Sequence, residues 1–300
     1  MVNFILIAIC IAAGWLIRRG RILTKDAAQS TNIWILYVAM PATAFKYLPQ
    51  LKWSHDLVIP AVMPLIVWAG AWLMIKAFRN SFDKPTAAAL TITGGLGNTS
   101  FLGFPLVAAY FGENALSVAV ICDQVTFILL SSVAVVMAVL ASKKSGISLL
   151  QVVKRIIAFP PFISFIAALT LPKFIDISFL APLFDKLAST LAPLALFSVG
   201  IQLDFENWAR EIKPLGIGLV YKLLLAPTLI LLLVIAFRLK GLPAQIAIFE
   251  AAMAPMITAG ILADQHELNP PVSNLMVGLG ILISLVTTAV WWWIIRALVF

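Results

Sequence analysis

Long apolar segments follow one another along almost the whole chain, and this pattern is the strongest constraint on its fold. Each segment approaches or exceeds the roughly 20 helical residues that cross the hydrocarbon core of a bilayer. Charged residues make up 11% of the 300 residues and hydrophobic ones 62%, whereas a soluble domain carries about 25% charged residues. Because a protein in water cannot hide so much apolar surface, the sequence predicts an integral membrane protein.

The apolar segments are expected to be helices, because alternating short strands of a closed barrel are not seen. We predict an all-α integral membrane protein with ten transmembrane helices. The predicted spans cover residues 2–17, 29–48, 57–78, 86–111, 115–141, 152–172, 181–203, 214–237, 243–264 and 270–298. The connections are too short for an independent domain. Basic residues follow the first span instead of preceding it, which is the reverse of a cleavable signal peptide.

Basic residues in the connections predict the orientation, because cytoplasmic loops carry an excess of Lys and Arg. An outside N-terminus puts fourteen basic residues inside and seven outside. The inside residues are Arg18, Arg19, Arg21, Lys25, Lys76, Arg79, Lys84, Lys143, Lys144, Lys154, Arg155, Arg210, Lys213 and Lys222. The outside residues are Lys46, Lys52, Lys173, Lys186, Arg238, Lys240 and Arg296. We expect a multi-pass protein of the cell (inner or plasma) membrane with both termini outside.

Five spans in each half make the second half start on the opposite side of the membrane. Residues 1–150 and 151–300 are therefore expected to form two inverted five-helix repeats, an arrangement that many transporters use. Pro41 and Pro193 lie 152 residues apart in corresponding spans, and Pro85 and Pro243 lie 158 residues apart. Similar offsets are what a duplication predicts, although the chain has 17 prolines that could pair by chance.

The fourth and ninth predicted spans are each interrupted near the middle. Residues 94–105 hold four glycines, three consecutive polar residues and a proline, and residues 250–260 hold a glutamate, a proline and a glycine. With the offset of 158, Gly97 falls opposite Pro255. Matched broken helices are the best sequence pointer to a transporter binding site, because free N–H groups suit a carboxylate and free carbonyls suit a cation. The alternative is that the glycines only allow close helix packing.

Three ionisable residues stand out because they lie deep inside predicted spans, where a charge is costly and indicates function. Glu250 precedes the ninth-span break, Asp123 is followed by Gln124, and Lys222 lies about two turns into its span. Glu250 and Asp123 are candidates for coupling an ion, and Lys222 for a counter-charge to the substrate. The alternatives are a structural carboxyl group for Glu250, an Asp123–Lys222 pair, and a Lys222 side chain that reaches the interface.

The remaining candidate features favour structural roles. His55 and His266 fall in or beside loops and form no metal pair, and Cys10 and Cys122 lie inside apolar segments without disulfide spacing. Trp68 and Trp72 are expected to pack against neighbouring helices. The net charge of +8 lies in short loops instead of a patch, so the expected partners are the bilayer and a small solute and not nucleic acid.

The sequence resembles the auxin efflux carrier family, in its compact bacterial form, over essentially the whole chain. The resemblance is carried by GGLGNTSFLGFPLVAAYFG at 94–112, KLLLAP at 222–227 and EAAMAP at 250–255. It implies a panel of spans 1, 2, 6 and 7 and a core in which spans 4 and 9 cross at their breaks. Plant members carry auxin, and bacterial relatives are described as malate or malonate permeases. The long connection after span 5 in many plant members is reduced here to 142–151.

A more distant resemblance to the bile acid sodium symporters is carried by EAAM at 250–253 and NALSVAV at 114–120. It implies a sodium site at Glu250, Asn98 and Thr99, with Ser117 also matching by position. Ala254 and Pro255 replace the amide residues expected there, which puts a full pair of sodium sites in doubt. A proton therefore remains as plausible a coupling ion as sodium.

The expected function is secondary transport of a small organic anion, such as malate, malonate or an auxin-like acid, by alternating access. The predicted substrate-binding residues are Asn98, Thr99, Ser100, Pro105, Pro255, Met256, Thr258 and Lys222. The predicted ion-coupling residues are Glu250, Asp123, Gln124 and Ser117. No cofactor is expected, and a homodimer is left open. The alternatives are a sodium symporter of a bulkier amphipathic acid, a channel or signalling protein, and an intramembrane enzyme, for which no catalytic set is found.

Overall fold

The computed structural model describes residues 2–23, 26–51, 54–78, 80–142, 150–151, 154, 157–203 and 211–299, and these contain helices but no β-strand. Some residues used in the orientation count lie outside the described ones: Lys25, Lys52, Arg79, Lys143, Lys144, Arg155 and Arg210. The first residues of the predicted span 152–172 also lie partly outside them. The chain forms two compact units, each built from segments of both sequence halves.

Six helical segments among the described residues are long and apolar enough to cross a membrane, which supports a multi-pass membrane protein. They are Val2–Arg19, His55–Ala77, Glu113–Ala141, Ser178–Gln202, Ile212–Ala236 and Pro270–Leu298. The segments predicted at 29–48, 86–111, 152–172 and 243–264 also contain helices, but these helices are shorter, interrupted or more polar. The ten-span topology therefore stays a prediction.

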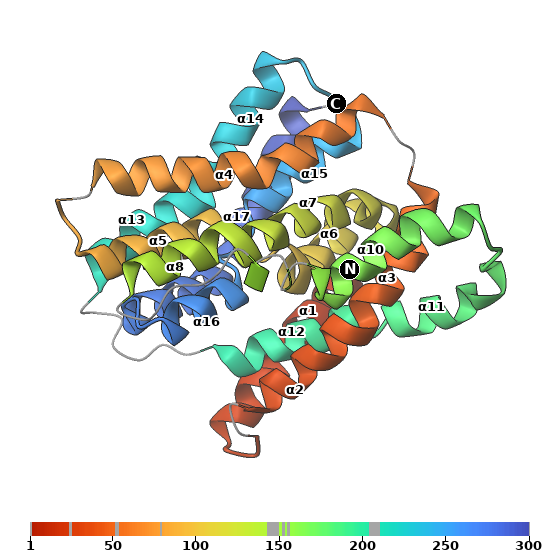
Figure 1. Cartoon of the computed structure of the whole chain (residues 1–300), viewed down its shortest axis with the longest axis horizontal. Helices are drawn as coiled ribbons and strands as arrows, with labels where there is room; N and C mark the ends of the chain where they lie inside the picture. Colours follow the sequence, from red (N-terminus) through yellow and green to blue (C-terminus); the bar gives the residue numbers. More distant parts are fainter. Residues whose placement is uncertain are drawn as a thin grey trace. The chain divides into compact units, whose positions relative to one another are not determined.

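The first unit comprises Met1–Trp53, Ser100–Val120 and Ile156–Leu203. Its helices are α1 (Val2–Arg19), α2 (Asp26–Trp34), α3 (Met40–Tyr47), α6 (Phe104–Phe111), α10 (Pro160–Thr170), α11 (Ala181–Ala188) and α12 (Leu191–Gln202), with the first turn of α7 (Leu116–Leu129). α1 lies along α12, and α3 packs against α10 and α11 (Figure 1).

Two glycines bring α1 and α12 into direct backbone contact. A Cβ atom on Gly14 would overlap the carbonyl oxygen of Phe197, and one on Gly200 would overlap the carbonyl oxygen of Ile11. Small residues allow membrane helices to approach this closely, and packing then replaces the hydrophobic effect as the source of association. The close α1–α12 contact therefore depends on both glycines.

We expect the substitution Gly200→Ala to lower the thermal unfolding temperature in detergent by several degrees. The added methyl group forces α1 and α12 apart, and overpacking of this kind costs about 1–3 kcal/mol. Gly216→Ala is the matched control, because no atom lies within 4 Å of its added Cβ. Differential scanning fluorimetry of both variants measures the effect. Equal melting temperatures would show that the contact contributes nothing to stability.

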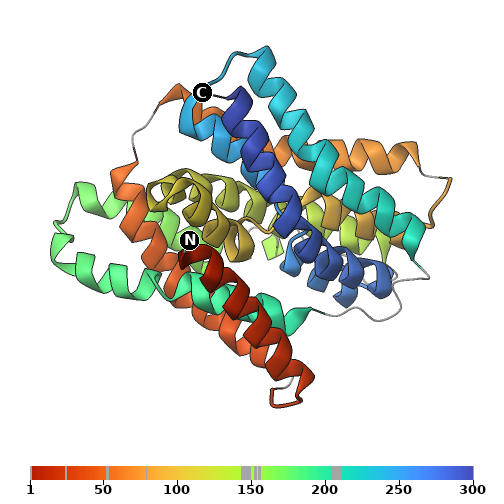
Figure 2. The same cartoon turned by 180° about the vertical axis from the view of Figure 1, so that it is seen from behind.

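The second unit comprises Ser54–Thr99, Ile121–Arg155 and Asp204–Phe300. Its helices are α4 (Val58–Ala77), α5 (Lys84–Gly95), most of α7, α8 (Val135–Ala141), α13 (Ile212–Val220), α14 (Ala226–Ala236), α15 (Gly241–Ala251), α16 (Ile257–Gln265) and α17 (Pro270–Leu298). Figure 2, which views the molecule from behind, shows α17 running through this unit. The core lies where α4, α5, α13 and α17 meet, and its residues are Ile75, Leu90, Leu215, Leu219, Leu223, Val272, Leu275 and Met276.

Three widened helical turns in the described chain are followed by a proline. The π-helical segments Ile35–Ala39, Thr99–Gly103 and Tyr221–Leu225 end two residues before Pro41, Pro105 and Pro227 respectively. Proline has no N–H group and its ring clashes with the carbonyl four residues earlier, and a wider turn relieves that clash.

Pro227 leaves the Leu223 carbonyl without its helical donor, and the structure supplies another one. The indole Nε1 of Trp291 on α17 donates to this oxygen at 2.9 Å. The widened turn is therefore fixed from the side by α17, and Lys222 lies within it.

The expectation for the two α4 tryptophans is half correct. Trp68 is buried and packs against Gly95 of α5. Trp72 is 43% exposed, and the Lys76 ammonium group lies 4.7 Å from the centre of its ring. Trp72 instead lies on the side of α4 that borders an open groove beside α5, whereas Ile75, further along the same helix, is buried again.

Candidate functional site

The two interrupted helices of the second unit meet at their breaks. α5 ends at Gly95 and α15 ends at Ala251. Between α15 and α16, the chain lies antiparallel to residues 96–98, with Gly97 opposite Pro255. The Asn98 N–H donates to the Ala254 carbonyl at 2.8 Å, and the Met256 N–H donates to the Leu96 carbonyl at 2.9 Å. Each break thus supplies hydrogen-bond partners for backbone groups of the other. The expected crossing at Gly97 and Pro255 is observed.

Lys222 places a buried ammonium group at this crossing. Its side chain is 1% exposed, and its Nζ atom donates to the Ala251 carbonyl at 2.9 Å. A Cβ atom on Gly97 would lie 3.1 Å from this Nζ atom, so a larger residue at position 97 would crowd it. The ammonium group therefore lies at the carboxyl end of α15, where the helix dipole favours a cation. No acidic oxygen within 4.0 Å of it is found in the described part of the chain.

Glu250 lies on the last turn of α15, beside Lys222. Its side chain is fully buried, and neither carboxyl oxygen has a hydrogen-bond partner among the described residues. It lies within electrostatic range of Asp123 and Lys222. A charged carboxylate is disfavoured both by burial and by the negative end of a helix dipole. This environment favours a Glu250 that is protonated or that holds a cation.

Asp123 on α7 brings a second buried carboxyl group to the second unit. Its side chain is 2% exposed, and its Oδ1 atom accepts a hydrogen bond from the Thr99 hydroxyl at 2.7 Å. Gln124 is also buried, and its Oε1 atom has no partner among the residues that the structure describes. Two carboxyl groups and one ammonium group therefore share this region, which leaves one negative charge to be balanced if all three are ionised.

The N-terminus of α16 presents backbone donors next to the crossing. Met256 is its N-cap residue, and no side chain caps the helix. The N–H groups of Ile257, Thr258 and Ala259 come before the first helical hydrogen bond, which Gly260 donates to Met256. Thr258 is exposed at this end, whereas Pro255 and Met256 are buried. A helix start of this kind suits an anion.

Gly280 of α17 makes room for the bend that leads into α16. A Cβ atom on Gly280 would lie 2.5 Å from the Pro255 ring. The break in the ninth predicted span is therefore packed directly against the last helix. A larger side chain at this position would displace Pro255 and the residues that pair with 96–98.

The remaining predicted site residues lie in the first unit. Ser100 is buried in the segment Thr99–Gly103, and Pro105 lines a cavity of about 180 Å³. Ser117 is only half-buried, and its hydroxyl donates to the Asn114 carbonyl at 2.9 Å in its own turn. The structure groups Asn98, Thr99, Asp123, Lys222, Glu250 and Pro255 in the second unit, and it does not place Ser100, Pro105 or Ser117 in that unit.

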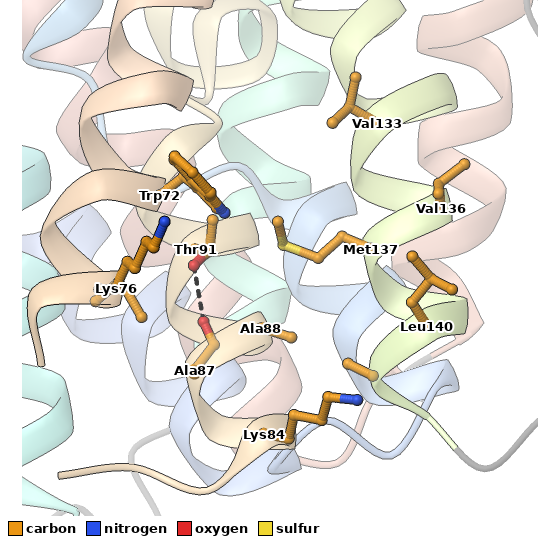
Figure 3. Close-up of a pocket in the computed structure, with 12 residues that line it drawn as sticks. Trp72, Lys76, Lys84, Ala87, Ala88, Thr91, Val133, Val136, Met137 and Leu140 are labelled. Atoms are coloured by element: carbon orange, nitrogen blue, oxygen red, sulfur yellow. Dashed lines mark hydrogen bonds between the residues drawn. The ribbon is translucent and has the colours of Figure 1, made fainter. Parts of the chain in front are cut away.

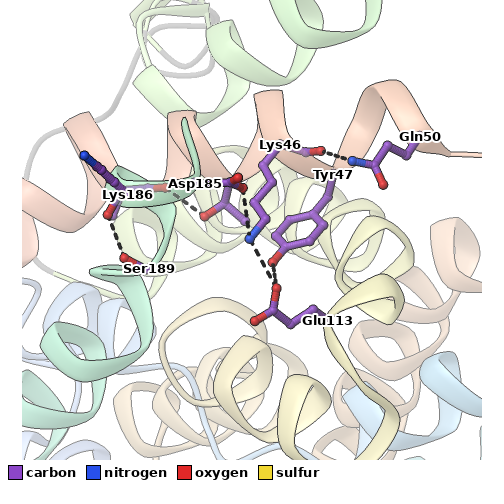
Figure 4. Close-up of polar contacts among 9 residues, drawn as sticks. Lys46, Tyr47, Gln50, Glu113, Asp185, Lys186 and Ser189 are labelled. Atoms are coloured by element: carbon purple, nitrogen blue, oxygen red, sulfur yellow. Dashed lines mark hydrogen bonds and ion pairs between the residues drawn. The ribbon is translucent and has the colours of Figure 1, made fainter. Parts of the chain in front are cut away.

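Sequence reasoning missed an ion-pair cluster in the first unit. Lys46 of α3 lies 3.2 Å from a carboxyl oxygen of Glu113 and 3.3 Å from one of Asp185 (Figure 4). The Tyr47 hydroxyl donates to the same Glu113 oxygen at 2.8 Å. These contacts tie α3 to α11 and to the turn before α7. Nothing in the residue spacing indicates the cluster, because its three charged members come from distant segments.

These features together match the pattern expected of a membrane-embedded binding site in a transport protein. Two broken helices meet at their breaks. A buried ammonium group, buried carboxyl groups and a helix N-terminus without a side-chain cap lie around this crossing. In the described chain no group of three or more His, Cys, Asp and Glu residues could hold a metal ion. The arrangement can bind an anion at one end of a broken helix and a proton or small cation at the other.

The family model described as "Membrane transport protein" matches residues 1–292. The chain belongs to this family, the auxin efflux carrier family, as the residues of both broken helices predicted. It is 23% identical over 290 residues to an "Uncharacterized transporter" of Methanothermobacter thermautotrophicus, with 95% of each chain covered. A second "Uncharacterized transporter", of Methanocaldococcus jannaschii, is 23% identical, with 97% of each covered. A "Putative malonate transporter" of Rhizobium meliloti is 26% identical over 80% of this chain and 78% of its own length.

Proposed function

We propose that the protein is a secondary transporter of small carboxylates, coupled to protons. The observation that carries the proposal is the buried Lys222 ammonium group at the crossing of two broken helices, where it lacks a carboxylate partner within 4.0 Å among the described residues. A buried cation whose hydrogen-bond partner is a neutral carbonyl, in the same crossing as the N–H groups that begin α16, is a place for an anion. The relative named as a malonate transporter supports a dicarboxylate, such as malonate or malate, as substrate.

In the proposed complex, one substrate carboxylate accepts hydrogen bonds from the N-terminus of α16, near Thr258. Lys222 supplies the counter-charge from the neighbouring break, and Asn98, Thr99 and the backbone at Pro255 and Met256 shape the remaining contacts. A charge-assisted hydrogen bond to a carboxylate is roughly twice as strong as a neutral one. A substrate without a carboxylate would lose these contacts, which supports selectivity for organic anions.

Glu250 is proposed to carry the coupling proton. Its carboxyl oxygens lack partners in the described chain, and the ammonium group of Lys222 already occupies the carbonyl end of α15 that would otherwise attract a sodium ion. A proton neutralises the Glu250 carboxylate without needing additional ligands. Sodium coupling through Glu250, Asn98 and Thr99 is the alternative that the transport assay distinguishes.

The proposed architecture is that of two inverted repeats crossing the membrane ten times. Helix contacts within the units support the repeats, because they come in pairs that correspond between the two halves. The α1–α12 contact corresponds to the α10–α3 contact, and the α4–α15 contact corresponds to the α13–α5 contact. Swapping the two halves turns one contact of each pair into the other. Alternating access would then come from movement of a core, which contains the crossing, against a panel of spans 1, 2, 6 and 7.

Both termini are proposed to lie outside the cell membrane, and cysteine labelling checks this orientation. We expect a membrane-impermeant thiol reagent to label Asp176→Cys in intact cells and Ser81→Cys only after permeabilisation. Both positions are exposed, and the background variant has Cys10 and Cys122 replaced by alanine. The opposite labelling pattern would place the termini inside, and equal labelling of both would contradict the predicted span number.

The function is tested by uptake of radiolabelled malonate and malate into proteoliposomes, with proton and sodium gradients imposed separately. We expect saturable uptake that depends on the proton gradient, and competition by unlabelled dicarboxylates. Uptake driven by a sodium gradient alone would show that sodium, and not a proton, is the coupling ion. If folded protein shows no carboxylate uptake under any gradient, the carboxylate assignment is wrong, although membership of the transport family stands.

A further inference from the structure

A groove of about 590 Å³ runs along the second unit, away from the crossing of the broken helices. Ala87, Ala88 and Thr91 of α5 form its floor (Figure 3). α4 and α8 stand on either side of this floor, and both pack against α5. Because the floor residues are small, the walls rise above them and leave a channel. None of the residues proposed for transport lines it.

The walls of the groove are apolar, and they are exposed at the surface of the unit. α8 and the turn before it contribute Val133, Val136, Met137 and Leu140, and Leu140 is 73% exposed. The only polar side chain on the floor, Thr91, donates its hydroxyl hydrogen to the Ala87 carbonyl at 2.8 Å and offers no donor to a ligand. From position 133 to 141 the wall is about 12 Å long, since a helix rises about 1.5 Å per residue. The groove therefore suits an extended hydrocarbon chain.

Two lysines lie at one end of the groove. Lys76 of α4 and Lys84 at the start of α5 line this end, and both side chains are exposed. Neither has an acidic oxygen within 4.0 Å in the part of the chain that the structure describes. Lys76 instead lies over the ring of Trp72, also a lining residue (Figure 3). Tryptophan and lysine side chains at the end of a span are typical of the headgroup level of a bilayer.

We propose that this groove binds an anionic phospholipid, with an acyl chain along α5 and α8 and the headgroup at the part of the groove that Lys76 and Lys84 line. The apolar walls match the chain, and the two exposed lysines, which have no acidic partner among the described residues, match the phosphate charge. Lys76 and Lys84 give one part of the groove a positive charge, and its remaining lining residues are uncharged. In the proposed orientation the lysines face the cytoplasmic leaflet, where anionic lipids attract basic residues by about 1 kcal/mol each.

Quenching of Trp72 by brominated lipid tests the proposal on the purified full-length protein in neutral detergent. Phosphatidylglycerol with brominated acyl chains is titrated against phosphatidylcholine with the same chains. We expect stronger quenching by phosphatidylglycerol, and we expect the excess to vanish in the variant Trp72→Phe. The comparison with this variant is needed because the chain has nine tryptophans.

The lysines are tested by Lys76→Gln, Lys84→Gln and the double variant. We expect the apparent affinity for phosphatidylglycerol to fall about fivefold in each single variant and about 30-fold in the double variant, which corresponds to about 2 kcal/mol. The matched control is the double variant Lys173→Gln/Lys240→Gln, which removes the same charge from two exposed lysines elsewhere. Size-exclusion profiles confirm that each variant is folded.

A further variant addresses the hydrocarbon part of the groove. Ala141→Phe places a large side chain at the end of the α8 wall, and we expect it to weaken quenching by phosphatidylglycerol without removing a charge. Three results would overturn the proposal. They are equal quenching by the two lipids, an unchanged preference in the Lys76→Gln/Lys84→Gln variant, and full displacement of the lipid by millimolar inorganic phosphate.

Discussion

Replacing Glu250 by glutamine is expected to abolish gradient-driven accumulation of substrate and to leave counterflow exchange largely intact. Glutamine keeps the size of the side chain but stays neutral and cannot release a proton. A carrier with glutamine at this position behaves as if Glu250 were always protonated. It can exchange labelled for unlabelled substrate across the membrane, but it cannot use a proton gradient to accumulate it. The separation of these two modes is the signature of a coupling residue.

The size of the effect follows from the surroundings of Glu250. The side chain is fully buried on the last turn of α15, and its oxygens have no partner among the described residues. No nearby group in that part of the chain is placed to take over its proton by a direct hydrogen bond. Loss of an essential proton-transfer group typically costs about 100-fold or more in rate. We therefore expect at least about 100-fold slower proton-driven uptake, with counterflow changed by less than about threefold.

Proteoliposomes with an imposed pH gradient measure accumulation, and preloaded vesicles without a gradient measure counterflow. Asp264→Asn is the matched control, because it removes an exposed carboxyl group from α16. The control is expected to behave like the unmodified protein in both assays. Unchanged proton-driven uptake by the Glu250→Gln variant would remove Glu250 from the coupling mechanism. Equal loss of both modes would indicate a structural role instead.

The crossing of the two helices was predictable because glycine, proline and polar residues are rare in membrane-spanning helices and have a direct effect on the backbone. The composition of residues 94–105 and 250–260 is enough to predict that both helices are interrupted there. The offset that matches Pro85 with Pro243 also matches Gly97 with Pro255. The structure places Gly97 and Pro255 opposite each other. Backbone chemistry, which is local, is therefore readable from the sequence.

The partners of buried charges were not predictable in the same way. An Asp123–Lys222 pair was one alternative left open by the sequence, but Asp123 accepts a hydrogen bond from Thr99, and Lys222 donates one to the Ala251 carbonyl. Which group a lysine meets depends on the rotation and depth of its helix, and here Pro227 and Trp291 fix both through the widened turn at Tyr221–Leu225. Such packing constraints act between distant segments and leave no periodic signal. The Lys46 cluster went unnoticed for the same reason.

Replacing Lys222 by methionine is expected to abolish both proton-driven uptake and counterflow. Methionine retains an unbranched apolar chain of similar length but removes the only ammonium group that the structure places against the crossing in the described chain. A substrate carboxylate would then enter a buried site without a counter-charge. Removing one member of a buried charge pair costs about 2–5 kcal/mol, so we expect the substrate affinity to fall by at least about 30-fold.

Binding of substrate to the purified variant, measured by isothermal titration calorimetry or by thermal stabilisation, checks this prediction directly. Lys213→Met is the matched control, because Lys213 lies near the start of the same predicted span and is exposed. We expect this control to bind substrate with unchanged affinity. Wild-type affinity in the Lys222→Met variant would show that the substrate does not use this ammonium group.

The double variant Lys222→Met/Glu250→Gln separates a substrate role of Lys222 from a purely structural one. If Lys222 served only to balance the charge of Glu250, neutralising both residues would restore folding stability and counterflow together. If Lys222 meets the substrate, the double variant would still fail to bind or exchange carboxylates. We expect the second result, because the Nζ atom lies against Gly97 and the Ala251 carbonyl, at the crossing itself, and not within 4.0 Å of the Glu250 carboxyl oxygens.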